Sequence, residues 1–259
     1  MLPLPDDPRF KPLEGGEFRF ACHPGVPCFN QCCRKLNLVL TPYDILRLKN
    51  RLGITCQEFI QRYAKVKAGQ NGWPQVWLLM TDPPEATCPF LSQEGCLVYP
   101  DRPGACRTYP LGRAAKGGAG GGPREEAFFL VREDHCRGFE EGPTWTPEQW
   151  MKDQGLSPYN RMNDRFLPLI TRQAQDGDPQ VIAKKMRMFA LACYDLEGFR
   201  RFVFETSLTR MFEISQKRLE RMQDDDEELL LFAFDWLGFS IFGDATLHLR
   251  AEVTRPGSC

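Results

Sequence analysis

The cysteines of this chain limit what its front half can fold into. The chain has 11 cysteines in 259 residues, and nine of them fall between positions 22 and 136. Two of the nine, Cys32 and Cys33, are adjacent. Side chains of neighbouring residues diverge, and a disulfide between them would be strained. A stretch this rich in thiols therefore needs something other than the pairing of neighbours to organise it.

Metal binding is the chemistry that best explains these thiols. In a reducing compartment, a dense group of cysteines is more often metal-binding or catalytic than disulfide-bonded. Without the isolated Cys56, enough cysteines remain for two sites of four thiolates each. Because Cys32 and Cys33 point apart, we predict two closely spaced centres that share the 28–33 loop; the alternative is one site with spare thiols nearby. The candidate ligands are Cys22, Cys28, Cys32, Cys33, Cys88, Cys96, Cys106 and Cys136.

The spacing of the cysteines favours iron–sulfur clusters over zinc. Zinc fingers and ribbons usually pair their ligands in tight Cys-x2-Cys knuckles. No such knuckle occurs in the chain, and the nearest spacing is Cys28-x3-Cys32. The pair Cys88-Pro89 also occurs in ferredoxin-like ligand loops. Two 4Fe-4S clusters are the predicted cofactors, with zinc as the alternative. Radical S-adenosylmethionine chemistry is disfavoured because its Cys-x3-Cys-x2-Cys run is absent.

Charge and hydropathy argue against several other classes of function. The 33 basic and 34 acidic residues are mixed along the chain and give a net charge of −1. The sequence has no stripe of basic residues that would bind the phosphates of nucleic acid, so no nucleic-acid partner is expected. The N-terminus lacks a basic segment followed by an apolar one, which predicts no signal peptide. The longest apolar run, 229–243, is too short to span a bilayer and contains Asp235. A cytoplasmic protein without a membrane span is expected.

The composition changes near residue 142 and predicts an α+β protein with two domains. Residues 1–142 are rich in Pro, Gly and Cys. They are predicted to form a loop-rich, metal-binding domain with short helices and a small β-hairpin or sheet. Residues 143–259 are predicted to form a mainly helical domain that packs against the first.

The front half carries signals for a few short elements. Capping boxes predict one helix over 41–53 and a second that begins at Thr55. Segments 72–82 and 125–134 have the composition of strands, and we expect them to pair around the cysteine loops. The glycine-rich segment 116–124 between them is expected to be a flexible loop.

The rear half carries strong helix signals. Helices are predicted to begin where Thr, Ser or Asp precedes proline, at 146, 157 and 178. Pro168 should end or kink the second of these helices. The third has an apolar stripe, at spacings of three and four residues, that continues to Val203. The segment 224–243 opens with acidic residues and becomes almost wholly apolar, which predicts a buried packing helix.

Three further cysteines are not candidate ligands. Cys56 lies at the start of a predicted helix, where the helix dipole would lower its pKa, but a structural role is the favoured interpretation. Cys193 lies on the apolar stripe and is predicted to be a small core residue. Cys259 is the last residue and is expected to be free.

Polar residues beside the candidate ligands supply further site candidates, although no catalytic residue is identified. Two histidines each adjoin a candidate ligand, which suggests a mixed site or a hydrogen bond to a ligand, but with eight thiols available neither is needed as a ligand. Two arginines flank Cys106 and would offset the charge of a thiolate cluster or grip an anionic substrate; the alternative is that they bond loop carbonyls. Two tyrosines of the same loop are expected to serve packing. These residues are His23, His135, Arg102, Arg107, Tyr99 and Tyr109.

Three segments of the chain resemble a known family. "HPGVPCFNQCC", "CPFLSQEGCLVYPDRPGACRTYPLG" and "HCRGF" are similar to segments of the YkgJ-like cysteine cluster family, the zinc- or iron-chelating CxxCxxCC proteins. The resemblance covers about 20–140 and implies metal binding. The family pattern is Cys-x2-Cys-x2-Cys-Cys, whereas this chain has Cys22-x5-Cys28-x3-Cys32-Cys33. The departure implies a different placement of the first two ligands, Cys22 above all.

The resemblance leaves three functions open. A similar cluster occurs in the flagellin lysine N-methylases, which implies S-adenosylmethionine as a further cofactor and protein lysine methylation as one function. The leading alternative is an iron–sulfur protein with a redox or enzymatic role and an unidentified protein or redox partner. The third is a non-enzymatic zinc- or iron-chelating module, in which the metal supplies folding energy. A pocket beside the cluster lined by Arg102 and Arg107 would favour the methylase.

Overall fold

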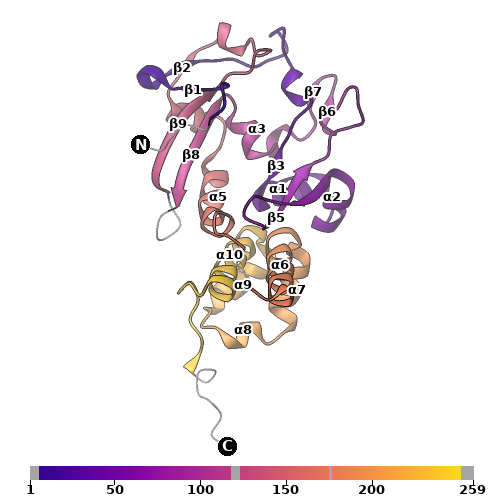
Figure 1. Ribbon diagram of the computed structural model, residues 1–259, viewed down its shortest axis with the longest axis vertical. Coiled ribbons are helices and arrows are strands. Elements are labelled where there is room, and N and C mark those ends of the chain that lie inside the picture. The colour runs from indigo at the N-terminus through magenta and orange to yellow at the C-terminus, as the bar shows by residue number, and fades with distance from the viewer. Residues whose placement is uncertain (1–5, 118–122, 175–176, 252–259) are drawn as a thin grey trace, which may run out of the picture.

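The computed structural model describes residues 6–117, 123–174 and 177–251. Figure 1 shows the small sheets and the cysteine-bearing loops at one end of the molecule and a group of helices at the other. The predicted α+β class is confirmed: short strands in small sheets precede a helical C-terminal region. Cys259 and the glycines at 118–122 lie outside the described residues. No helix in the described part of the chain has the length and apolar character needed to cross a bilayer.

The strands form small antiparallel sheets. The two larger sheets have the orders β1-β9-β8 and β3-β5-β4. Short pairs join β10 to β2 and β6 to β7. The strands are β1 (Phe10–Pro12), β2 (Phe18–Arg19), β3 (Val39–Leu40), β4 (Ala64–Ala68), β5 (Pro74–Leu78), β6 (Leu91–Ser92), β7 (Gly95–Cys96), β8 (Leu111–Gly117), β9 (Pro123–Val131) and β10 (Thr144–Trp145).

The predicted strands exist, but the expectation that they pair with each other is wrong. The segment 72–82 contains β5, which lies between β3 and β4. The segment 125–134 contains most of β9, which lies between β1 and β8. Each strand pairs with a partner that follows or precedes it by a short connection, and such local pairing costs less loop-closure entropy than a distant one. Part of the segment expected to be a loop, 116–124, belongs to β8 and β9.

The two predicted helices of the front half are confirmed, with their caps. Thr41 Oγ1 accepts the N–H of Asp44, whose carboxylate accepts the N–H of Thr41 at 2.8 Å. Thr55 and Glu58 form the same reciprocal pair at the second helix. The front-half helices are α1 (Pro42–Leu52), α2 (Cys56–Tyr63) and the short α3 (Gly104–Thr108). Single 3-10 turns are η1 (Glu14–Gly16), η2 (Gln31–Cys33), η3 (Tyr99–Asp101) and η4 (Gly138–Glu140).

The rear half is helical, as expected, but the helices at 208–211 and 216–224 were not predicted. Pro168 was expected to end or kink its helix; the helix continues past it to Ile170, so it does not end there. The apolar stripe spans two helices, because Asp195 leaves helical geometry and its carboxylate caps the second helix by accepting the Gly198 N–H at 3.0 Å. The helices are α4 (Pro147–Asp153), α5 (Ser157–Ile170), α6 (Pro179–Tyr194), α7 (Leu196–Glu205), α8 (Leu208–Met211), α9 (Gln216–Asp224) and α10 (Asp226–Phe242).

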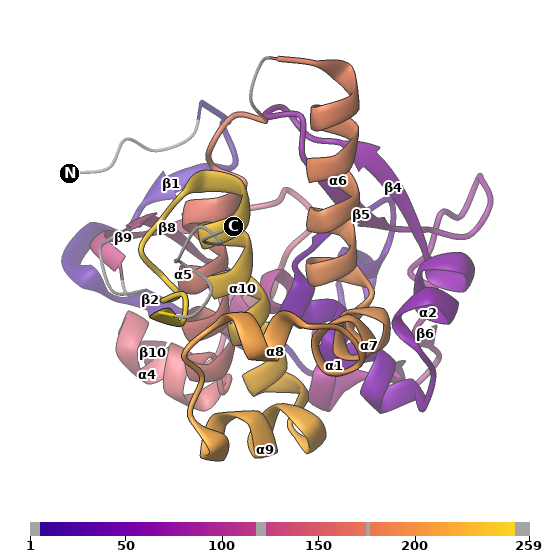
Figure 2. The same cartoon turned by 90° about the horizontal axis from the view of Figure 1, so that it is seen from below.

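Two apolar cores hold these elements together. The larger core packs α1, α2 and the β3-β5-β4 sheet against α5, α6, α7 and α10. Figure 2 shows α6 beside β5 and α10 beside α5. Cys193 is buried in this core, as predicted. The smaller core consists of Phe18, Phe20, Leu111, Leu130 and Trp150. Both cores contain residues from either side of position 142, so the two-domain division stays a prediction.

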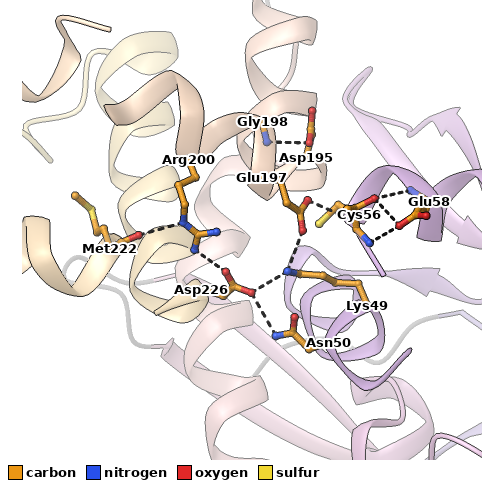
Figure 3. Close-up of polar contacts among 11 residues, drawn as sticks. Lys49, Asn50, Cys56, Glu58, Asp195, Glu197, Gly198, Arg200, Met222 and Asp226 are labelled. Carbon is orange, nitrogen blue, oxygen red and sulfur yellow. Dashed lines mark hydrogen bonds and ion pairs between the residues drawn. The ribbon is translucent and has the colours of Figure 1, made fainter. Parts of the chain in front are cut away.

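A buried ionic network joins the front half to the helices (Figure 3). Lys49 of α1 has a side chain only 8% exposed, and its Nζ lies 2.9 Å from Glu197 and 2.8 Å from Asp226. Arg200 also donates to Asp226, at 2.6 Å. Burial alone would lower the pKa of Lys49, but its hydrogen bonds with the two carboxylates raise that pKa. The network therefore keeps Lys49 charged at the junction.

Candidate metal centre

The eight candidate thiols lie on loops and short elements. The elements β2, β6, β7 and α3 lie in the upper half of Figure 1. We call residues 20–36, 86–110 and 133–142 the cysteine loops. Cys22 and Cys28 lie between β2 and η2, and the adjacent pair Cys32–Cys33 lies in η2. The other four are Cys88 just before β6, Cys96 in β7, Cys106 in α3 and Cys136 between β9 and η4.

Hydrogen bonds tie the first cysteine loop to the third. The Ala21 N–H donates to the Gly138 carbonyl at 2.9 Å. The Arg137 N–H donates to the sulfur of Cys28 at 3.1 Å. These two bonds place Cys22 and Cys28 beside the turn that carries Cys136. The Arg137 donor was not predicted, although the segment "HCRGF" places this residue directly after a candidate ligand.

The second cysteine loop lies against the adjacent pair. The Cys88 N–H donates to the carbonyl of Cys33 at 2.8 Å. Cys88 and Cys96 flank one hairpin, since Leu91 faces Cys96 across the β6–β7 pair and its N–H donates to the Cys88 carbonyl at 3.0 Å. A Cβ built on Gly95 would meet the ring of Phe29 at 3.5 Å, so the 28–33 loop lies in contact with the hairpin.

The structure brings the backbone segments together, but the side chains are not assembled around a common point. Within 6–117, 123–174 and 177–251, no three His, Cys, Asp or Glu side chains form a group that would hold an ion as they stand. The thiols must turn toward a metal to bind it. The assignment of eight ligands therefore stays a prediction, and we expect metal binding to order these loops.

Burial raises the pKa of most candidate thiols. It raises the pKa of Cys88 to about 11, and it is the main cause of the raised pKa at Cys96 and Cys136. A hydrogen bond with Cys33, and then burial, raises the pKa of Cys32. Cys22 and Cys106 are exposed to solvent, but partial desolvation and neighbouring thiols raise the pKa of both. These six thiols are protonated at neutral pH until a cation displaces their protons, so metal affinity should increase with pH.

The surroundings of Cys136 fit a metal-bound thiolate. The hydroxyl of Tyr109 is buried beside Cys136. Burial raises the pKa of Cys136, and a hydrogen bond with this hydroxyl partly opposes the effect. A thiolate at Cys136 would accept a hydrogen bond from the same hydroxyl. The all-thiol donor set suits a soft metal or an iron–sulfur cluster.

The two arginines make the contacts that the alternative interpretation predicted. Arg102 donates to the carbonyl of Tyr99 at 2.8 Å and to the side chain of Gln154. Arg107 donates to the carbonyls of Gln154 and Pro100, at 2.6 and 2.5 Å. Both arginines are buried, and they brace the loop between Cys96 and Cys106. The positive charge of Arg102 also acts to lower the pKa of Cys22 and Cys96, against the effect of burial.

The remaining site candidates, His23, His135 and Tyr99, are exposed. His23 accepts the Gly25 N–H through Nδ1 at 3.2 Å, and its Nε2 lies 3.4 Å from Glu141. The Nε2 of His135 lies 3.6 Å from Glu133. Tyr99 is exposed, with the guanidinium of Arg102 stacked 3.8 Å from its ring centre. A ligand role for either histidine stays a prediction.

Cys56 is a core residue, in agreement with the favoured interpretation. It is buried against the larger core, and its N–H donates to Glu197 at 3.1 Å. Burial raises the pKa of Cys56 to about 12, which outweighs the lowering expected from the helix dipole.

Comparison with known proteins supports the cysteine segment alone. Residues 21–137 match the family model CxxCxxCC, whose description is "Putative zinc- or iron-chelating domain". This range contains all eight candidate ligands. No curated protein and no solved structure gives a significant match to the chain.

Proposed function

Because residues 21–137 carry the zinc- or iron-chelating CxxCxxCC domain, we propose that this protein holds two cysteine-ligated centres and that both are iron–sulfur clusters. The observation that carries the proposal is the set of eight thiols on loops that hydrogen bonds hold together. The Cys88 N–H donates to the Cys33 carbonyl, and the Arg137 N–H donates to the Cys28 sulfur. Four thiolates satisfy one 4Fe-4S cluster, and eight satisfy two.

The chemistry of the donors favours iron–sulfur over zinc. The ligands lie on irregular loops rather than in Cys-x2-Cys knuckles, which are the usual zinc arrangement. N–H donors that point at sulfur, such as that of Arg137 toward Cys28, are among the features that set cluster potentials. A bound cluster supplies a one-electron centre, and this chain would exchange electrons with a protein partner or use the cluster in a redox-assisted reaction.

No observation favours the methylase. The structure shows an open cleft of about 720 Å³, but its lining contains neither Arg102 nor Arg107. It is lined instead by residues of α1, by Asp101 and by Asp224–Glu227. Both arginines are committed to loop contacts, so a methyl-donor site beside the cluster gains no support from them.

Anaerobic purification with metal and sulfide analysis tests the proposal. We expect a brown protein with a broad visible absorption band and about eight iron atoms and eight sulfides per chain, four of each per cluster. A colourless protein with stoichiometric zinc would contradict the iron–sulfur proposal and support the chelating module. Cys193→Ala serves as the control, because Cys193 lies in the apolar core and its removal should leave metal content unchanged.

A further inference from the structure

The β3-β5-β4 sheet has one edge that is open to solvent. β4 lies beside β5 (Figure 2), and among the described residues no strand pairs with its other side. Residues 65–68 of this strand are all exposed. The other large sheet has better protected edges. β1 has three residues and ends at Pro12, whereas β8 lies against α5, where Arg113 donates to Asp164 at 2.8 Å.

The main-chain groups of alternate β4 residues point away from β5. Directly after β4, the Gly69 N–H donates to the Trp73 carbonyl at 2.8 Å and continues the register of the pair. In an antiparallel pair, every second residue bonds the partner strand. Counted back from Gly69, the residues that bond β5 are Lys67 and Lys65, so the N–H and C=O of Val66 face the open edge. An added strand can bond these groups.

An apolar row of the sheet ends in an exposed side chain at this edge. Leu40, Val76 and Val66 lie opposite one another on the three strands. Leu40 and Val76 are fully buried, whereas Val66 is 52% exposed. An apolar side chain on a strand added beside β4 would cover Val66 and extend the row.

The opposite face of β4 carries two lysines. Lys65 and Lys67 are exposed, and neither forms an ion pair with a described residue. The ammonium group of Lys67 lies 5.6 Å from the centre of the Trp77 ring, which holds it over the sheet. Like charges on neighbouring strands repel, so two copies of β4 would pair poorly. Carboxylates on an added strand would instead attract both lysines.

We propose that the open edge of β4 binds an extended, acidic segment of a partner protein, which adds antiparallel to the sheet. The partner residue that bonds the Val66 main chain packs its side chain beside Val66, and its two neighbours lie opposite Lys65 and Lys67. These neighbours form non-hydrogen-bonded pairs, in which side chains come closest, so Asp or Glu is favoured there. The recognised pattern is therefore acidic, apolar, acidic. This recognition requires no metal.

Peptide binding to the full chain tests this docking site. The probe is a fluorescent, end-capped peptide of alternating Glu and Val, and the control peptide has Lys in place of Glu. By fluorescence anisotropy, the acidic peptide should bind at least about tenfold more tightly, since attractive charge pairs replace repulsive ones. Hydrogen exchange of the Val66 amide should slow when the acidic peptide binds. Equal affinities, or an unchanged Val66 amide, would overturn the proposal.

Charge reversal tests the role of the lysines. The double variant Lys65→Glu, Lys67→Glu should invert the preference and bind the basic peptide more tightly. Lys11→Glu in β1 is the control, because Lys11 is another exposed lysine of an edge strand and its reversal should leave the preference unchanged. A double variant that still prefers the acidic peptide would contradict recognition by Lys65 and Lys67.

The main-chain bonds are tested from both sides of the edge. Val66→Pro removes the outward N–H and no bond to β5, so the sheet should persist while peptide binding is lost. If this variant fails to fold, an acidic peptide methylated at its Val nitrogens gives the same test, because those N–H groups would bond β4. Methylation at the Glu nitrogens is the control and should leave binding intact. Binding that survives methylation at Val would refute strand addition, as would a dimer of the chain that Val66→Pro dissociates.

Discussion

The cysteine loops and the helical body, which we define as α1 and α5–α10, are held together in different ways. The helical body is built on apolar burial: α10 has 17 residues, most of them buried. The cysteine loops contain elements of two to five residues, such as β6, β7 and α3, joined by single main-chain hydrogen bonds. Burial of many apolar side chains stabilises the first region, whereas the second contributes only a few to the cores, such as Phe90 and Val98. The loops should therefore depend on a metal for their order.

Metal removal gives the largest expected effect. Chelation or acid treatment should remove the cross-links of the cysteine loops and leave the helical body folded. At a free metal level of about 1,000 times Kd, binding stabilises the bound state by about 4 kcal/mol. Hydrogen exchange should therefore show that protection falls steeply in residues 20–36, 86–110 and 133–142, and that it persists in α6 and α10.

Loss of hydrogen-exchange protection outside the loops would be equally informative. If α6 and α10 lose protection together with the loops, the molecule is one cooperative unit and the contrast between the regions is wrong. The shared larger core makes this outcome a real test, because α1 and the β3-β5-β4 sheet pack directly on the rear helices.

A substitution in the helical body should have the reverse signature. Phe232 is fully buried in α10 and packs near Phe199. Phe232→Ala removes this ring and leaves a cavity, so the free energy of unfolding should fall by about 4 kcal/mol. Metal per folded chain should stay at the wild-type value. Val181→Ala, at an exposed position of α6, is the control and should change stability by less than about 0.5 kcal/mol in thermal unfolding.

The ionic network inside the helical body, which joins α1 to α7 and α10, comes next. Lys49→Met leaves Glu197 and Asp226 without their shared cation and should cost about 3 kcal/mol. Burial alone would raise the pKa of Asp226 and of Glu197, but hydrogen bonds, from Arg200 and Lys49 to Asp226 and from Lys49 to Glu197, hold both values below normal. Their contribution is therefore present above about pH 4 and is lost as the pH falls through the depressed values.

Denaturant unfolding at pH 7 and pH 3 measures this contribution. The difference in stability between wild type and Lys49→Met should shrink at the lower pH. The exposed pair of Arg62 and Glu58 in α2 is the matched control, and Arg62→Met should change stability by about 0.3 kcal/mol. If the two substitutions lower the free energy of unfolding equally, the ionic network around Lys49 contributes no more than an exposed pair.

Local signals in the sequence identified much of the helical body, although α8 and α9 were not predicted. The capping boxes at Thr41 and Thr55 depend on residues three positions apart, and both occur as predicted. The apolar stripe correctly placed Cys193 in the core. The break in this stripe at Asp195 was missed. Asp195 falls between two apolar positions, so the apolar spacing continues across it although the residue caps a new helix.

Long-range contacts explain part of what the sequence did not predict in the front half. Besides a nearby strand, β5 and β9 each pair with a strand distant in the sequence, β3 and β1. The helix α3 has five residues and begins with Gly104, so propensity does not predict it. Tertiary bonds form α3, since Asp44 accepts from Gly104 and Arg107 reaches Gln154. Cysteine spacing identified the donors, but only the folded chain shows which loops lie together.

The smallest predicted effect concerns the cap of α1, which contacts both regions. Thr41→Ala removes one cap hydrogen bond and should lower the free energy of unfolding by about 1 kcal/mol. Thr41 also donates to Asp44, the residue that holds Gly104 at the start of α3. Thr55→Ala is the matched control, because its capping box at α2 has the same form and its acid, Glu58, pairs with Arg62 of the same helix.

Metal titration of the two variants separates stability from site geometry. If the helical body merely supports the loops, both variants should lose about 1 kcal/mol and bind metal with the wild-type affinity. A weaker affinity in Thr41→Ala alone would show that the position of Asp44 controls Cys106 through α3. In that case the boundary between the two regions would lie at α3 rather than at α1, because the order of α3 would depend on α1 as well as on metal.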